Sequence, residues 1–161
     1  MAFRSDRVQF VLRGGVACLL VLGILLRVSH LDRQLYWGDE VYTSLRISGY
    51  TVAEIEQELG GRAIAVAEMR KYQSPGPWKT SSDTVRGLAL EEAQHVPLYF
   101  VLARAWAQCF GDSVAVIRGL SALFSLLAFP CLYWLSRELF ESSRVAWFAM
   151  ILMAVSPVHL V

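Results

Sequence analysis

Charged residues are scarce in this sequence. They make up 18% of its 161 residues, whereas hydrophobic residues make up 55% and aromatic residues 12%. A chain of this length ordinarily forms one domain, but long apolar stretches with so little charge are typical of membrane spans rather than of a soluble domain. The 15 basic and 14 acidic side chains nearly cancel, and nothing in the sequence points to nucleic acid as a partner.

Cysteine is also sparse, and internal repeats are missing. Cys18, Cys109 and Cys131 lie far apart in apolar segments without the spacing of metal ligands, so we expect them to be buried free thiols. A transporter is disfavoured because no internal repeat is visible. Arg104 and Arg118 are, in addition, too few intramembrane charges to mark a transport pathway.

Three apolar segments have the character of membrane spans. Residues 8–28 would reach ~30 Å at ~1.5 Å per residue, enough to cross a bilayer. The basic residues before this segment also suit a signal peptide, but no small-x-small cleavage site follows it, which favours an uncleaved span. Arg27, near its outer end, is expected to snorkel outward. The other two predicted spans are residues 113–136 and 144–161.

Residues 31–95 differ from the rest of the chain in their charge. They hold ten acidic and seven basic side chains, against four and eight elsewhere, so we expect a water-facing loop. Residues 96–111 follow with Arg104 in their middle, and they are short for a span, which is typical of an interfacial helix. If this helix does not cross, Arg137 and Arg144 fall in the cytoplasm, as the positive-inside rule asks. The sequence therefore predicts an all-α membrane protein with about three transmembrane helices and an extracytoplasmic loop that carries juxtamembrane helices.

The loop itself contains local helix signals. "DEVYTSLRI" indicates a short helix that opens at Asp39. Thr51 and Glu54 form an S/T-x-x-E capping box at the start of a second helix. Gly60 and Gly61 interrupt that segment, and we expect them to divide it in two.

Asp39 and Glu40 are the first candidates for chemistry. Acidic residues at a helix N-terminus are also explained by the helix dipole alone, which stabilises them by ~0.3–1 kcal/mol. Their position beyond a span, however, places them near headgroup depth, where Tyr36 and Trp37 would anchor the interface. A partly desolvated carboxylate with a like charge beside it can have a raised pKa and act as a general base on an acceptor hydroxyl. The adjacent carboxylate would orient the acceptor or bind a divalent cation.

Two further polar residues are candidates for substrate binding. His95 stands where the chain returns to the membrane surface, one turn after Glu91 and Glu92, so it is either a cap, a solvated side chain or part of a carboxylate–imidazole cluster. Arg118 lies in the outer half of the next predicted span and would either meet a lipid phosphate or snorkel to the surface.

The order of these elements resembles the N-terminal part of GT-C glycosyltransferases, in the group of protein O-mannosyltransferases and bacterial aminoarabinose transferases. "YWGDEVYTSLRI" is similar to the acidic motif that opens the first outer loop of that family. "HVPLYFVLARAWAQCFGDSVAVIRGLSALFSLLAFPCLYWLSRELF" is similar to its block around H-x-P-L-Y-Y, L-W, F-G and R-x-x-S-A-L-F. "AMILMAVSPVHLV" is similar to its next span, which ends in an S-P-x-H-like stretch. The resemblance covers nearly the whole chain apart from residues 51–90.

The resemblance implies an inverting transferase that moves a sugar from a polyprenyl-phosphate carrier to a hydroxyl acceptor. The active side would be the extracytoplasmic face of the cell (inner) membrane, with the protein crossing it several times. Asp39 is the implied base with Glu40 beside it, and His95 falls at the mouth of the cavity. The implied partners are the lipid-linked sugar donor, the bilayer and an unidentified acceptor. No cofactor is certain, and a divalent metal ion stays open.

One departure from the family is its length, because members of the family are much longer and have more spans. We therefore expect the 161 residues to be the front of a complete enzyme, a truncated product or a piece that needs a partner. The alternative hypothesis is a small non-catalytic membrane protein, such as an assembly partner derived from such an enzyme.

Overall fold

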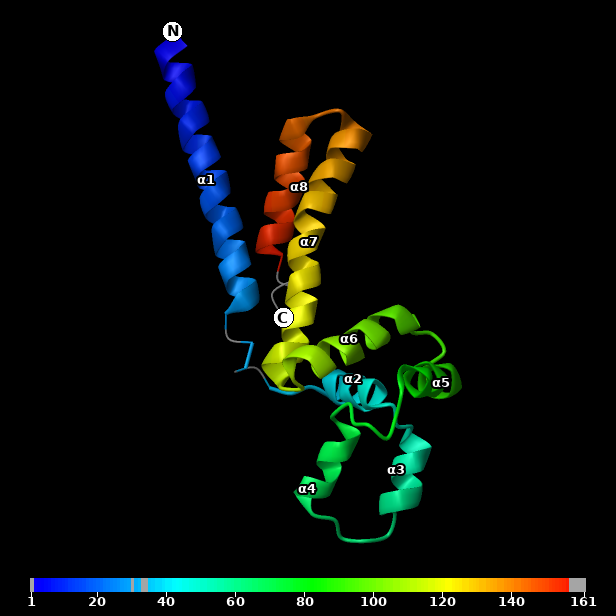
Figure 1. Ribbon diagram of the computed structural model, residues 1–161. Helices are drawn as coiled ribbons and strands as arrows, with labels where there is room; N and C mark the ends of the chain where they lie inside the picture. The colour runs from blue at the N-terminus through cyan, green and yellow to red at the C-terminus, as the bar shows by residue number, and fades with distance from the viewer. Residues whose placement is uncertain (1, 30, 33–34, 157–161) are drawn as a thin grey trace. The chain divides into compact units, whose positions relative to one another are not determined.

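The fold was obtained as a computed structural model, which describes residues 2–29, 31, 32 and 35–156, with side chains from residue 14 onward. The all-α prediction is confirmed: the described residues form eight α-helices and one short 3-10 helix, and no strand. The chain divides into two compact units (Figure 1). The terminal unit comprises Met1–Leu31 and Ser121–Val161, and the central unit comprises Asp32–Leu120.

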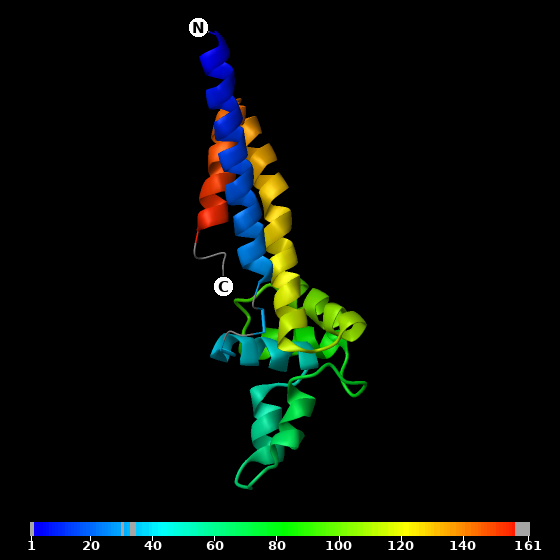
Figure 2. The ribbon, with the colours of Figure 1, turned by 90° about the vertical axis from the view of Figure 1, so that its left-hand side faces the viewer.

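The terminal unit consists of α1 (Ala2–Val28), α8 (Ser143–Val155) and most of α7 (Val114–Phe140). Helices α1 and α8 run side by side in both ribbon views (Figures 1 and 2). They approach closely at Gly23, where an added Cβ would lie 2.9 Å from the Cβ of Ala154. Small residues are what allow two helix backbones to approach in this way.

The helices of the terminal unit differ in length. Helix α7 is long and apolar enough to cross a membrane, whereas the apolar parts of α1 (Gly14–Val28) and α8 are shorter. The predicted span 113–136 is thus part of a helix that continues to Phe140. The predicted span 144–161 corresponds to α8, and its last five residues lie outside the described part of the chain. The number of crossings remains a prediction.

The central unit contains six helical segments: α2 (Gly38–Ser48), α3 (Val52–Leu59), α4 (Val66–Met69), η1 (Arg70–Tyr72), α5 (Ser81–Glu91) and α6 (Pro97–Phe110). One cluster of buried side chains joins α2, α5, α6 and the start of α7 through Ile47, Leu88, Phe100 and Leu120. A second cluster joins α2 to α3 and η1 through Leu45, Leu59 and Tyr72. Helix α2 belongs to both clusters, so its position is fixed from two sides.

The local helix signals of the loop act as expected. Thr51 Oγ1 accepts a hydrogen bond from the Glu54 N–H, and the Glu54 carboxylate accepts one from the Thr51 N–H, at 3.1 and 2.9 Å. Helix α3 ends at Leu59, and Gly61 follows with a φ of 77°, a backbone conformation that favours glycine. The predicted capping box and the predicted interruption are both confirmed.

Two expectations about side-chain surroundings are wrong. The three cysteines are free, as expected, but they are exposed on the surfaces of their helices rather than buried. Arg27 does not snorkel outward. Only 4% of its surface is exposed, because its guanidinium turns toward the backbone of α8. Hydropathy locates apolar helices, but it does not show which face of each helix packs inward.

Candidate active site

The acidic pair lies at the start of α2. Trp37 is extended and occupies the N-cap, and Asp39 and Glu40 fall in the first helical turn. Glu40 Oε2 accepts the N–H of Trp37 at 3.0 Å, which satisfies one of the donors that a helix start leaves without an intrahelical partner. Both carboxylates also face the positive end of the helix dipole.

Arg118 of α7 binds Glu40 with two parallel hydrogen bonds. Arg118 Nε lies 2.6 Å from Glu40 Oε1, and Nη2 lies 2.8 Å from Oε2. The same Nη2 also donates to the carbonyl of Leu35 at 3.0 Å. This fork geometry is among the strongest forms of charge-assisted pairing. Of the two expectations for Arg118, snorkelling is therefore wrong, since only 10% of its side chain is exposed.

The two carboxylates are consequently in different states. Hydrogen bonding from Arg118 holds the pKa of Glu40 below its ordinary value, and the Trp37 N–H acts in the same direction against partial desolvation. A carboxylate so stabilised is a poor proton acceptor. The side chain of Asp39 is exposed, and its carboxylate has no hydrogen bond or ion pair to the described residues. Glu40 is thus held in place by its ion pair, whereas the carboxylate of Asp39 is accessible.

Tyr36 and Trp37 flank the pair in different ways. The Tyr36 hydroxyl donates to the carbonyl of Glu40 at 3.0 Å and shares a short hydrogen bond with Ser44. Burial is the main cause that raises the pKa of this phenol. Trp37 has 70% of its surface exposed, so its indole is accessible to a ligand or to lipid. Tyr36 thus braces the first turns of α2, and Trp37 projects from them.

His95 belongs to a second polar cluster. Its Nδ1 lies 3.2 Å from Glu92 Oε2, and its ring stacks on Phe100 with centroids 5.9 Å apart. Glu92 and Glu91 both bind Arg46, at 3.2 and 2.7 Å. The structure thus confirms a carboxylate–imidazole arrangement at residues 91–95 and brings Arg118, but not His95, into contact with the acidic pair.

Two buried arginines were not identified as site-forming residues from the sequence. Arg46 and Arg104 are each 1% exposed. Arg104 Nη1 donates to the Ile47 carbonyl at 2.6 Å, while Nη2 donates to the carbonyls of Gly76 and Lys79. Arg104 is therefore directed into the central unit and fixes the loop between η1 and α5. An arginine in the middle of an apolar helix was the available signal, but its partners are non-local.

The described residues contain no cluster of side chains that is suited to bind a metal ion. Across 2–29, 31, 32 and 35–156, no group of three or more His, Cys, Asp or Glu side chains is arranged to hold a metal ion. Near Asp39 the second carboxylate is already engaged by Arg118.

The comparison with protein families matches one part of the chain. Residues 94–161 match the family model described as dolichyl-phosphate-mannose-protein mannosyltransferase. No curated protein and no solved structure matched the chain. The matched segment contains α6, α7 and α8, including Arg118, whereas the acidic pair lies ahead of it. The chain is therefore similar to the dolichyl-phosphate-mannose-protein mannosyltransferase family over residues 94–161, which is less than half of its length.

Proposed function

We propose that this chain carries the acidic motif and first helices of a GT-C glycosyltransferase that transfers a sugar from a polyprenyl-phosphate donor to a hydroxyl acceptor. The observation that carries the proposal is the fork between Arg118 and Glu40. Arg118 lies inside the family-matched segment, and it holds the acidic motif in a fixed place. Asp39, next to Glu40, stays exposed and accessible to an acceptor.

In the proposed reaction Asp39 acts as the general base. It accepts the proton of the acceptor hydroxyl, whose oxygen attacks the anomeric carbon of the donor sugar. The bond between that carbon and the phosphate oxygen breaks, and the lipid phosphate leaves with the electron pair. Attack from the face opposite the leaving group inverts the anomeric configuration. Since the phosphate is a good leaving group, the protein mainly positions the acceptor and removes a proton.

Glu40 is a positioning residue in this proposal. Its carboxylate binds Arg118 on one side and the Trp37 N–H on the other, so the first turn of α2 cannot rotate freely. The lowered pKa of Glu40, caused chiefly by Arg118, keeps this carboxylate ionised and hydrogen-bonded while Asp39 exchanges protons. A base must be held within hydrogen-bond reach of its proton for this chemistry.

The surface of α6 supports a membrane location for the site. Its inward face packs Phe100, Ala103 and Ala107 into the central unit. Leu98, Leu102, Ala105 and Cys109, which follow the helical repeat, are exposed along the opposite face. An amphipathic helix of this kind is suited to lie in a membrane interface. We therefore propose that α6 lies on the extracytoplasmic face of the cell (inner) membrane of a multi-pass protein, where a lipid-linked donor would be present.

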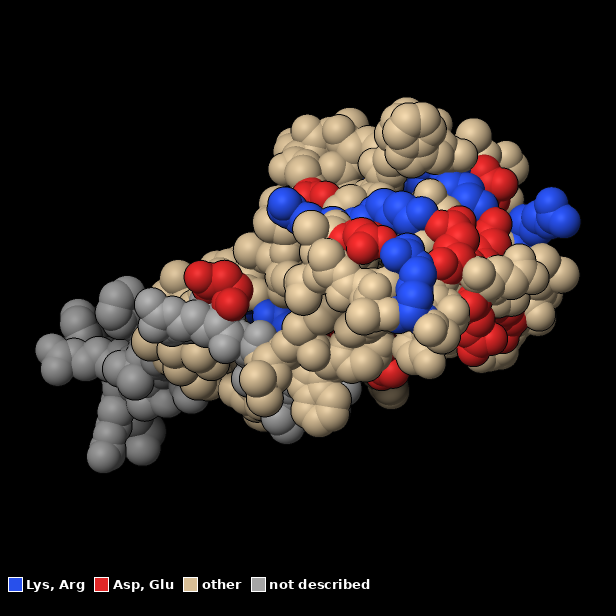
Figure 3. All heavy atoms as spheres, turned by 90° about the horizontal axis from the view of Figure 1, so that it is seen from below, with Lys and Arg blue, Asp and Glu red and all other residues tan. Residues whose placement is uncertain are grey.

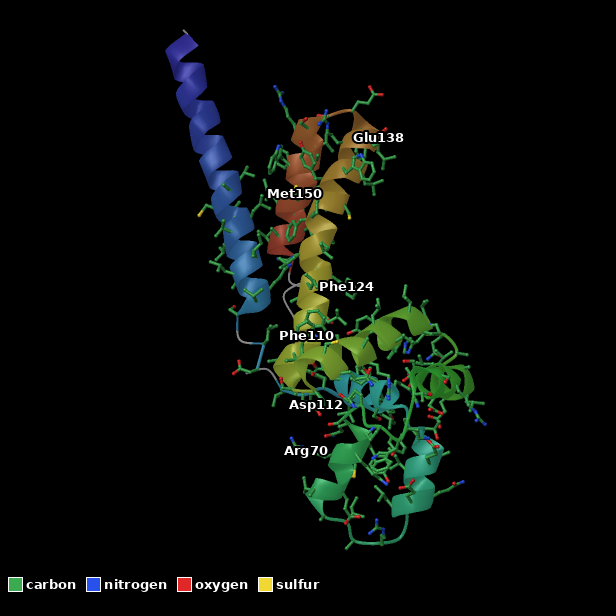
Figure 4. All side chains as sticks on the ribbon, viewed as in Figure 1. Arg70, Phe110, Asp112, Phe124, Glu138 and Met150 are labelled. Atoms are coloured by element: carbon green, nitrogen blue, oxygen red, sulfur yellow. The ribbon has the colours of Figure 1, made fainter. Side chains whose placement is uncertain are left out.

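The proposal is tested by Asp39→Asn in the complete enzyme in membranes. Sugar transfer from a polyprenyl-phosphate donor is expected to fall ~10²–10⁴-fold, which is what general base catalysis contributes. The matched control is Asp112→Asn, because Asp112 is an exposed carboxylate in the connection between α6 and α7, beside Phe110 (Figure 4). The control is expected to keep its full rate.

Full transfer by Asp39→Asn would reject Asp39 as the base. If the variant were also functionally normal and the protein co-purified with a larger membrane complex, the alternative of a non-catalytic assembly partner would hold. The variant Glu40→Gln distinguishes the role of Glu40 from that of Asp39. It is expected to lower the rate less than Asp39→Asn, because the amide can still accept one hydrogen bond from Arg118.

A further inference from the structure

Both terminal nitrogens of the Arg27 guanidinium, on α1, donate to carbonyls of α8, and one of them also donates to a carbonyl of α1. Nη2 donates to the carbonyl of Met153 at 2.7 Å, and Nη1 donates to the carbonyl of Ala154 at 3.1 Å. Nη1 also donates to the carbonyl of Gly23 at 2.8 Å. These acceptors are uncharged, although Arg27 is one of the most deeply buried cations in the described chain.

The two α8 carbonyls that Arg27 reaches belong to the last turn of that helix. Helix α8 ends at Val155, and the last four carbonyls of a helix have no intrahelical donor. The sequence adds a specific reason at Met153. The residue four positions later is Pro157, which has no N–H and so cannot donate to the Met153 carbonyl. The N–H of Ser156 lies 3.4 Å from it, a longer contact than that of Arg27.

Other groups hold the guanidinium in this place. Its Nε donates to Ser125 Oγ of α7 at 2.9 Å, and its carbon lies 5.0 Å from the centre of the Phe129 ring, within cation–π range. The close approach of α1 and α8 at Gly23 and Ala154 makes the reach short enough for both nitrogens to engage carbonyls. Arg27 thus connects all three helices of the terminal unit.

We propose that Arg27 caps the C-terminal end of α8 in trans, through the carbonyls of Met153 and Ala154. In an apolar environment an unpaired carbonyl is costly, so a helix that ends there needs a donor from elsewhere. Arg27 supplies two. The role is a positioning one, because Arg27 sets where α8 stops, and it does not depend on the proposed transferase activity.

A double-mutant cycle between Arg27 and Pro157 tests this role. The full chain in detergent would be compared as wild type, R27M, P157A and the double variant, with the apparent Tm as readout. R27M is expected to lower the Tm by roughly 5 °C or more. It removes the guanidinium donors from the carbonyls of Met153 and Ala154, and it leaves the Met153 carbonyl with the longer contact to the Ser156 N–H. P157A supplies an N–H four residues after Met153. In that background we expect R27M to cost less than half as much.

The matched control is R144M, an arginine in the first turn of α8 that is exposed, and its Tm is expected to equal that of the wild type. Equal shifts for R27M in the two backgrounds would overturn the proposal, since additivity means that Arg27 and Pro157 act independently. If R27M does not accumulate as folded protein, R27K takes its place. Lysine keeps the positive charge but lacks the planar fork of donors. A partial decrease in Tm for R27K that becomes smaller in the P157A background supports the cap. A decrease in Tm that is the same in both backgrounds rejects it.

Discussion

The buried arginines of the terminal and central units differ in the chemical type of their hydrogen-bond partners. In the terminal unit Arg27 is surrounded by carbonyls, a hydroxyl and an aromatic ring. In the central unit Arg46 is paired with the carboxylates of Glu91 and Glu92, and Arg118 with that of Glu40. A cation held by neutral acceptors keeps them at any ordinary pH. A cation held by carboxylates loses them in acid.

Arg104 differs from the other buried arginines of the central unit because its partners are uncharged. Its replacement is expected to have the largest effect on stability. The hydrogen-bond acceptors of Arg104, like those of Arg27, are uncharged: they are the carbonyls of Ile47, Gly76 and Lys79. Arg104→Met would leave these groups unpaired at a site that is 1% exposed. We expect a loss of about 3–5 kcal/mol in the free energy of unfolding, measured by denaturant unfolding.

Arg104→Lys is the matched comparison for this variant. A lysine ammonium can donate to some of the three carbonyls but lacks the planar fork, so an intermediate loss is expected. A loss below about 1 kcal/mol for Arg104→Met would mean that water replaces the arginine, and that the loop between η1 and α5 does not depend on it.

Acid is expected to destabilise the central unit more than the terminal unit, by a moderate amount. The pKa of Glu40 is lowered mainly by Arg118. Burial raises that of Glu91, but hydrogen bonds from the Val52 N–H and Arg46 outweigh it and lower it overall. A carboxylate with a lowered pKa in the folded state stabilises the protein above its unfolded pKa. That contribution is lost as the pH falls through the folded pKa.

The resulting expectation concerns the pH range below 4.5, the ordinary glutamate value. Protection of central-unit amides against hydrogen exchange should fall there, while that of α8 should change less. Glu91→Gln provides the control, because it removes one of the titrating groups and should flatten the pH dependence. Parallel losses of protection in both units would show that the difference in arginine partners has no thermodynamic consequence.

The sequence predicts best what depends on neighbours in the chain. The capping box of Thr51 and Glu54 spans three residues, and the interruption at Gly61 needs only its own backbone conformation. The acidic pair at the start of α2 is likewise local. These features follow from helix-end chemistry, which a short window contains.

Partner assignments could not be predicted in the same way. Glu40 and Arg118 are 78 positions apart, and Arg27 meets α8 across 126 and 127 positions. Which face of a helix turns inward depends on the packing of the whole unit, and an arginine in an apolar helix is equally compatible with snorkelling and with burial. For the same reason the exposed cysteines were expected to be buried.

The smallest expected effect concerns the exposed ion pairs of the central unit. Figure 3 shows Lys and Arg side chains interspersed with Asp and Glu over one face. One such pair is Lys71 with Glu58, whose side chains are 44% and 46% exposed. Hydrogen bonding to Glu58 raises the pKa of Lys71, yet solvent screens a pair so open. Lys71→Ala should therefore leave the denaturation midpoint unchanged at physiological ionic strength, and a clear loss that 1 M salt abolishes would instead assign these surface charges a share in holding α3 against η1.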